Sequence, residues 1–172
     1  MSRIERPEAS EYDVFYETYV SKVPQGDILE LLASQRDELA RLLSSIDDER
    51  ALYRYAEGKW SIKQVAGHLA DAERILACRA LCFARQERAA LPGFDENEYV
   101  AAADFERRPL RSLITELDHL RGATVELFAG LSPDELSRRG TASGVSFSVR
   151  SFAFIIAGHE RHHLGVLRDR YL

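Results

Sequence analysis

Four long segments of this 172-residue chain repeat apolar residues at helical spacing, and no segment alternates apolar and polar residues over a sustained run. A helix returns to the same face every three to four residues, whereas a strand alternates with a period of two. The pattern therefore predicts an all-α fold, a four-helix bundle. The expected helices cover about residues 27–47, 61–86, 110–131 and 148–171, with N-caps at Asp27 and Ser61.

The connection between the second and third predicted helices is too long for a simple antiparallel hairpin. It begins at a Pro92-Gly93 turn, and we expect a short helix over residues 96–102 within it. Long crossovers are expected when consecutive helices of a bundle are not up-and-down neighbours. A loop over residues 140–144 is expected before the last helix. No internal repeat interrupts this plan, so we expect one domain over residues 1–172.

Composition argues against several classes of function. The formal net charge is -5, with 23 basic and 28 acidic residues, so no basic face for nucleic acid is expected. No apolar run approaches the roughly 20 residues that span a bilayer, and the first residues lack the apolar stretch of a signal peptide. We therefore expect a cytoplasmic protein that binds neither nucleic acid nor membrane.

The two cysteines, Cys78 and Cys82, lie four residues apart on the second predicted helix. We interpret them as small buried apolar residues in a reducing compartment, with a redox pair as the alternative. Cys82 lies fourteen residues beyond His68, which corresponds to about 21 Å along a helix. It cannot belong to a site built on that histidine.

Three histidines fall on the inward stripes of two predicted helices, His68 on the second and His159 with His163 on the last. Residues four apart on a helix project to the same side, so His159 and His163 can chelate one metal ion and His68 can complete the site. Three imidazoles would leave a first-row metal with an open position. The alternative is a metal-free bundle with hydrogen-bonded core histidines. The presence of all three histidines on inward stripes favours a metal, because burying three ring nitrogens without partners is costly.

Other histidines are placed differently by the same spacing. His162 flanks the inward stripe and is a candidate fourth ligand if the metal is structural, whereas His119 falls on a solvated face. The stretch H-E-R-H-H differs from the H-E-x-x-H motif of zinc peptidases. Glu160 lies about 100° around the helix from His159, which argues against a peptidase.

Charged residues near His68 supply further candidates. Arg79 lies three turns beyond His68 on the same stripe and could bind a carboxylate of a thiol or substrate; the alternative is an ion pair with a carboxylate of the bundle. Asp71 and Glu73 are candidates for orienting the metal ligands, with simple surface exposure as the alternative.

Several stretches resemble the DinB/YfiT-like superfamily of metal-dependent proteins. They are YVSKVPQGDILELLASQ, the segment from Tyr55 to Arg74 with WSIKQVAGHLADAER, then LPGFDENEY, and the ending AGHERHHLGVLRDRYL. The resemblance covers nearly the whole chain. It implies a four-helix bundle of unusual connectivity, with the metal held by His68, His159 and His163. Members of the family include thiol transferases and isomerases that use bacillithiol, mycothiol or glutathione.

Two functions are compatible with such a site. A metal with three neutral histidine ligands keeps its full charge and lowers the pKa of a bound water or thiol. The chain would then be an enzyme, thiol-transferase-like or hydrolase-like, whose partners are a small-molecule thiol and an electrophile. The alternative is a non-enzymatic stress-response or dimerisation module, a homodimer for example, with a structural metal.

The metal is one divalent ion of open identity, with zinc, nickel and iron all suited to imidazole. Because unperturbed histidine titrates near pH 6.5, the affinity of the site for the metal is expected to weaken below about pH 6.

Overall fold

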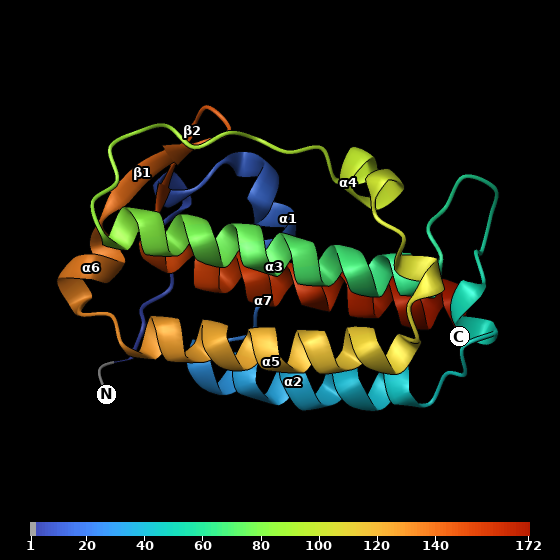
Figure 1. The fold of residues 1–172 in the computed structure, drawn as a ribbon. Coiled ribbons are helices and arrows are strands. Elements are labelled where there is room, and N and C mark those ends of the chain that lie inside the picture. Colours follow the sequence, from blue (N-terminus) through green and yellow to red (C-terminus); the bar gives the residue numbers. More distant parts are fainter. Residues whose placement is uncertain (1–2) are drawn as a thin grey trace.

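The computed structural model describes residues 3–172, in which four long helices pack side by side as a bundle (Figure 1). The prediction of an all-α four-helix bundle is confirmed. The predicted N-caps are also observed: Asp27 accepts a hydrogen bond from the backbone N of Leu29 at 2.8 Å, and Ser61 forms a capping box with Gln64. The long helices are α2 (Ile28–Ser44), α3 (Ile62–Ala84), α5 (Leu110–Ala129) and α7 (Val149–Val166), which a π-helical turn (Leu167–Tyr171) extends.

Shorter elements lie between and before the long helices. They are α1 (Glu17–Val20), α4 (Glu96–Ala102), α6 (Pro133–Ser137) and the 3-10 turns Ala9–Glu11, Val14–Tyr16, Arg50–Leu52 and Phe105–Arg107. The short helix predicted over residues 96–102 is α4. The sequence analysis did not predict α1, which packs against α7. Within residues 3–172, none of the helices has the length and apolar character that a membrane span requires.

Within residues 3–172, α2 and α3 are diagonal to one another, as are α5 and α7, whereas α3 and α5 are packed neighbours. Helix α3 packs against α5 and α7, and α2 packs against the same two helices from the other side. Neighbouring helix axes are about 8–10 Å apart, so a connection across the diagonal must be longer than one between neighbours. Helices α3 and α5 also run in the same direction, and the segment between them returns along the length of the bundle (Figure 1). This explains the long crossover seen in the sequence.

The prediction of a loop over residues 140–144 is wrong, because a small hairpin precedes α7. Strand β1 (Arg139–Ala142) pairs antiparallel with β2 (Val145–Ser148). Both turn residues have positive φ, 53° at Ser143 and 77° at Gly144, which is the conformation that suits a tight two-residue hairpin. Strands of four residues are too short for an alternating pattern to be recognised.

The bundle interior has an apolar core at each end and a polar layer between them. One core lies around Phe83, Phe128 and Phe152, and the other around Leu39, Leu113 and Leu164. Between these apolar positions each long helix contributes buried polar side chains, which we call the polar layer: Gln35, His68, Glu73, Arg121, Thr124, His159 and Glu160. The predicted histidine site lies in this layer.

A buried ion triad dominates the polar layer. Arg121 on α5 is 3% exposed and donates to Glu73 on α3 at 2.9 and 2.8 Å and to Glu160 on α7 at 2.6 Å. It also donates to the backbone O of Leu32 on α2 at 3.1 Å. Burial lowers the pKa of Arg121, but the charges of both glutamates outweigh it and raise that pKa above its ordinary value. One guanidinium therefore links all four long helices.

The triad corrects two expectations. From the leucine spacing of the third helix, Leu120 and Leu127 are expected to face inward with Leu113 and Leu117, but both are half-buried, and Arg121 and Phe128 take the buried positions beside them. Surface exposure, offered as the alternative role for Glu73, is wrong, because Glu73 is 4% exposed and paired. A charged residue is seldom buried unless it has partners, and its partners here lie on other helices.

Replacing Arg121 with Met should destabilise the fold by about 3–5 kcal/mol, because two buried carboxylates lose their shared cation. The measurement is urea unfolding at pH 8, followed by circular dichroism. Arg36→Ala is the matched control, since Arg36 pairs with Asp118 at the half-exposed surface and its loss should cost about 1 kcal/mol or less. Equal losses in the two variants would contradict the role assigned to the triad.

Candidate metal centre

His68 lies in the N-terminal third of α3, on the side that faces α7. It is 6% exposed, and its ring packs against Trp60 with 4.7 Å between the centroids. Trp60 immediately precedes the N-cap Ser61, whose hydroxyl accepts a hydrogen bond from the backbone N of Gln64 at 3.2 Å. The start of α3 thus places an indole over one side of the His68 ring.

The other two histidines lie one turn apart on α7. His159 is 8% exposed, and its ring centroid is 4.6 Å from that of His163. The Tyr19 ring of α1 meets His159 edge-on at 5.2 Å. Gly158 permits this approach, because a Cβ there would lie 2.1 Å from the carbonyl oxygen of Tyr19. The N-terminal segment can therefore cover the pair only with glycine at this position.

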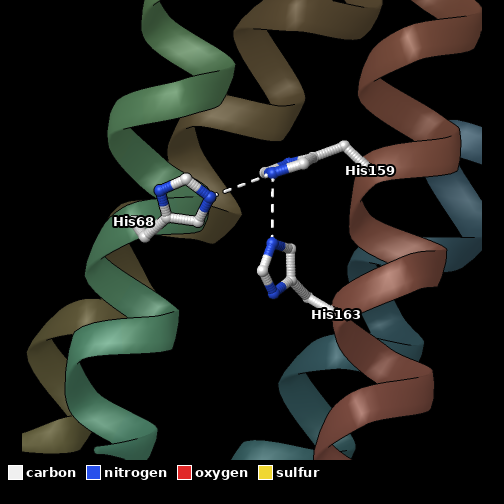
Figure 2. Close-up of side chains that lie close together, drawn as sticks. All are labelled: His68, His159 and His163. Carbon is white, nitrogen blue, oxygen red and sulfur yellow. Dashed lines mark hydrogen bonds between the residues drawn. The ribbon is translucent and has the colours of Figure 1, made fainter. Parts of the chain in front are cut away.

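The three rings converge on a single point between α3 and α7 (Figure 2). The Nε2 atom of His159 lies 3.0 Å from Nε2 of His68 and 3.2 Å from Nε2 of His163. One potential ligand atom from each residue lies within 4.8 Å of the other two. The structure thus brings together the three histidines that the sequence analysis selected.

This geometry suits a metal ion better than a hydrogen-bonded cluster. His159 Nε2 has either one proton or one lone pair, so it cannot form a good hydrogen bond with both neighbours. A tetrahedral ion with metal–nitrogen bonds of about 2.0–2.1 Å holds its ligand atoms about 3.3 Å apart. The observed separations of 3.0 and 3.2 Å are close to that value.

Electrostatics keep the three rings neutral at physiological pH. Burial lowers the pKa of His68 to about 4. Burial, with the neighbouring rings of His68 and His162, lowers the pKa of His163 to about 3. Burial, followed by the effect of the other histidines, also holds the pKa of His159 well below its ordinary value. Neutral imidazole is the form that ligates a metal.

The cluster lies in the wall of a cavity of about 310 Å³. Its walls are largely aromatic and apolar, and they come from the N-terminal segment, α3, the crossover before α4, the hairpin turn and α7. The lining residues are Phe15, Tyr16, Tyr19, Trp60, His68, Ala72, Leu76, Arg79, Phe94, Glu96, Ser143, Ile155, His159, His162 and His163. A small molecule of modest size fits such a space.

The remaining histidines lie where the sequence placed them. His162 lines the cavity and stacks edge-on with Tyr19 at 5.6 Å, but it is not part of the cluster of converging ligand atoms among residues 3–172. His119 is exposed on α5. The structure therefore separates the three clustered histidines from the other two.

The two cysteines do not belong to the site. The expectation of buried cysteines is wrong for Cys78, which is exposed, while Cys82 is half-buried; neither lines the cavity. Arg79 does line the cavity, but the alternative of an ion pair with a bundle carboxylate is not observed among residues 3–172. Its hydrogen bonds within the described chain go to the backbone O of Pro92 at 2.8 Å and to Ser143 Oγ at 3.1 Å.

Sequence reasoning missed most of the cavity wall. Tyr19 and Phe94 belong to segments without helical periodicity long enough to assign a face, and Ser143 lies in the unpredicted hairpin turn. A local pattern cannot show that such segments meet over the same two helices. Trp60, which precedes Ser61, entered the sequence analysis only as part of a stretch that resembles the superfamily, with no role assigned to it.

These observations define a class of protein. It is a four-helix bundle in which α2 lies diagonal to α3 and α5 to α7, and in which three imidazoles converge at a cavity. The family model described as the DinB superfamily matches residues 31–167, and the chain belongs to that superfamily. A protein of Oceanobacillus iheyensis named "putative metal-dependent hydrolase" is 26% identical over 141 residues, covering 81% of each chain. One of the same description from Geobacillus kaustophilus is 25% identical, covering 80% of each.

Solved structures agree on the fold. YfiT from Bacillus subtilis, described as a probable metal-dependent hydrolase with an unusual four-helix bundle topology, superposes with a TM-score of 0.71. It is 18% identical, and the match covers 96% of this chain and 90% of YfiT. A mycothiol-dependent maleylpyruvate isomerase superposes with a TM-score of 0.65 at 19% identity, covering 84% of this chain and 60% of the isomerase.

Protein purified without a polyhistidine tag should contain one divalent metal ion per chain, measured by elemental analysis. His68→Ala, His159→Ala and His163→Ala should each lose most of it, because each removes one of three converging ligands. The surface variant His119→Ala is the control and should retain it. Full metal content in a His159→Ala/His163→Ala double variant would contradict the site.

The variant His162→Ala tests the limit of the cluster. We expect near-stoichiometric metal in this variant, because His162 is outside the set of converging nitrogens. A loss as large as that of His163→Ala would make His162 a fourth ligand.

The buried histidines should make the metal-free protein sensitive to acid. In the unfolded chain they take up protons below about pH 6.5, while in the fold the pKa values of His68 and His163 are about 4 and 3. The free energy of unfolding should therefore fall as pH drops from about 6.5 to 4, by up to about 1.4 kcal/mol per pH unit for each histidine. Urea unfolding of wild type and of His68→Leu/His163→Leu in a chelator measures the difference, and parallel pH profiles would contradict it.

The same pKa values correct the expected pH dependence of metal binding. Protons should compete with the metal only below about pH 4 to 5, and not from about pH 6 as unperturbed histidines would imply.

Proposed function

We propose that this chain is a metal-dependent enzyme in which His68, His159 and His163 bind one divalent ion and an external nucleophile attacks a small electrophile in the adjoining cavity. The observation that carries this proposal is the convergence of three neutral imidazoles in the wall of an open cavity of about 310 Å³. A catalytic site needs both a ligand set that leaves a metal position free and space for substrate beside it.

A bound ion of this kind supplies Lewis acidity and lowers the pKa of a coordinated water or thiol. The protein residues supply position and surroundings. Trp60 and Tyr19 cover the rings of His68 and His159, which restricts their orientations and excludes water from their sides. The apolar wall from Leu76 and Ile155 provides a surface for the body of a substrate.

Neither cysteine is placed to supply the nucleophile, and we expect it to come from outside the protein. Cys78 and Cys82 do not line the cavity, and within residues 3–172 no cysteine belongs to the cluster. Water and a small thiol are the two candidates. The names of the relatives favour water, since they are described as hydrolases, and the structural neighbour that depends on mycothiol favours a thiol.

The alternative is a non-enzymatic module with a structural metal. Structural sites are closed by four protein ligands, whereas catalytic sites keep one position open. Among the described residues three ligand atoms converge, and His162 is not one of them. The open set favours the enzyme.

The nucleophile can be tested with cobalt-substituted protein. If a thiol is used, bacillithiol, mycothiol or glutathione should produce a sulfur-to-metal charge-transfer band. The same thiol should conjugate to 1-chloro-2,4-dinitrobenzene: a carbon–sulfur bond forms, chloride leaves with its electron pair, and the thiol proton passes to solvent. If water is used, activated esters should be hydrolysed without any thiol.

The matched variants are His68→Ala, which should lose either activity by at least about a hundredfold, and His119→Ala, which should retain it. Absence of both the charge-transfer band and any metal-dependent turnover would contradict the enzymatic proposal and favour the structural module.

A further inference from the structure

Arg79 has an unusual environment for a buried cation. It is 3% exposed, and its Nη1 atom has no hydrogen-bond partner among residues 3–172. Its Nη2 atom donates to two neutral acceptors, the backbone O of Pro92 at 2.8 Å and Ser143 Oγ at 3.1 Å. A buried charge without an opposite charge is costly, and a guanidinium can donate five hydrogen bonds. The site therefore lacks an anionic partner.

The position of Arg79 connects it to the histidine cavity. Eleven residues separate it from His68 on α3, a rise of about 16 Å, and a helical side chain leans toward the N-terminus, which here is toward His68. Both residues line the same cavity. The crossover and the hairpin turn are held beside the guanidinium by Pro92 and Ser143, and Phe94 lies under it at 5.7 Å.

The walls between the two ends are aromatic and apolar, including Leu76 and Ile155. Tyr16 also lines the cavity with its hydroxyl near Arg79: burial raises the pKa of Tyr16, and the guanidinium partly offsets that rise. The carboxylate of Glu96 also lines the cavity, but it is exposed at the start of α4 and forms no hydrogen bond with Arg79. A ligand that satisfied the whole cavity would have an anionic end, an apolar body and a second end at the histidines.

We infer that Arg79 forms a carboxylate-binding subsite, so that the ligands of this protein are elongated, amphipathic carboxylic acids whose reactive end reaches the three histidines. The inference rests on the proposed function for the role of that reactive end, but the subsite itself depends only on Arg79 and its surroundings. The carboxylate could belong to the electrophilic substrate or to the thiol, because both would enter the same cavity.

The test compares straight-chain carboxylates, hexanoate, octanoate and decanoate, with their uncharged amides by isothermal titration calorimetry. Metal-free protein is used first, so that direct ligation of a metal by the carboxylate cannot contribute. Wild type should bind at least one acid about tenfold or more tightly than its amide, because a charge-assisted hydrogen bond is replaced by a neutral contact. Equal affinities for every acid and amide pair would overturn the subsite.

Variants assign the preference to one residue. Arg79→Gln should reduce the preference for acid to about twofold or less while leaving amide affinity unchanged, and Arg79→Lys should keep part of it. Arg85→Gln, at the exposed end of α3 where Arg85 pairs with Glu135, is the control and should bind as wild type does. A full preference in Arg79→Gln would overturn the assignment. If that variant does not fold, the acid and amide comparison in wild type and Arg79→Lys still decides.

Failure of the subsite and failure of the enzyme are distinguishable. Acid preference in metal-free protein, without metal-dependent turnover on any substrate, would leave the subsite and reject the enzyme. Metal-dependent turnover without a preference for acids would support the enzyme and reject the subsite. To find which molecule carries the carboxylate, turnover by wild type and by Arg79→Gln is measured with two substrate pairs. The first pair is an electrophile that has a carboxylate and a neutral thiol, and the second is a neutral electrophile and a thiol that has a carboxylate. The pair whose turnover is reduced in Arg79→Gln contains the molecule whose carboxylate binds Arg79.

Discussion

The arrangement of this bundle depends on one buried cation, Arg121. Its guanidinium pairs with Glu73 and Glu160 and also reaches the backbone of Leu32, so that all four long helices meet in one polar layer between two apolar cores. Apolar contacts tolerate sliding and repacking, whereas an ion triad requires a particular register to satisfy its charges. Glu160 adjoins His159 in sequence, and Glu73 lies on the same helix as His68. The register that satisfies Arg121 is therefore also the register in which the histidines converge.

The order and direction of the helices produce the cavity. Because α2 and α3 are diagonal, α5 and α7 are diagonal, and the neighbours α3 and α5 run in the same direction, each connection between long helices has to cross or pass along the bundle. The first connection ends with Trp60, the second contributes Phe94, and the third contributes Ser143, while the N-terminal segment contributes Tyr19. All of these residues line the same cavity above α3 and α7. In an up-and-down bundle with short loops, the three histidines would have no such cover.

Much of the candidate metal centre was predictable because its three histidines lie on regular helices. The spacing of His159 and His163 places both on one face, and the apolar positions around His68 place it toward the interior, which the structure confirms by their proximity. The same reasoning did not identify Arg121, because a charged residue beside an apolar stripe is expected to be exposed unless its partners are known. It failed for the hairpin around Ser143, whose strands are too short for a recognisable pattern.

The sequence by itself determined the helical segments, their N-caps at Asp27 and Ser61, the inward placement of three histidines and the resemblance to the superfamily to which the chain belongs. These properties are local, because periodicity and capping involve residues within one or two turns of each other. Only the tertiary structure decided which helices are diagonal, which charges meet Arg121, and that Arg79 is buried beside the histidine cavity without an anionic partner among the described residues. Each of these depends on contacts between segments far apart in the chain, which no local pattern encodes.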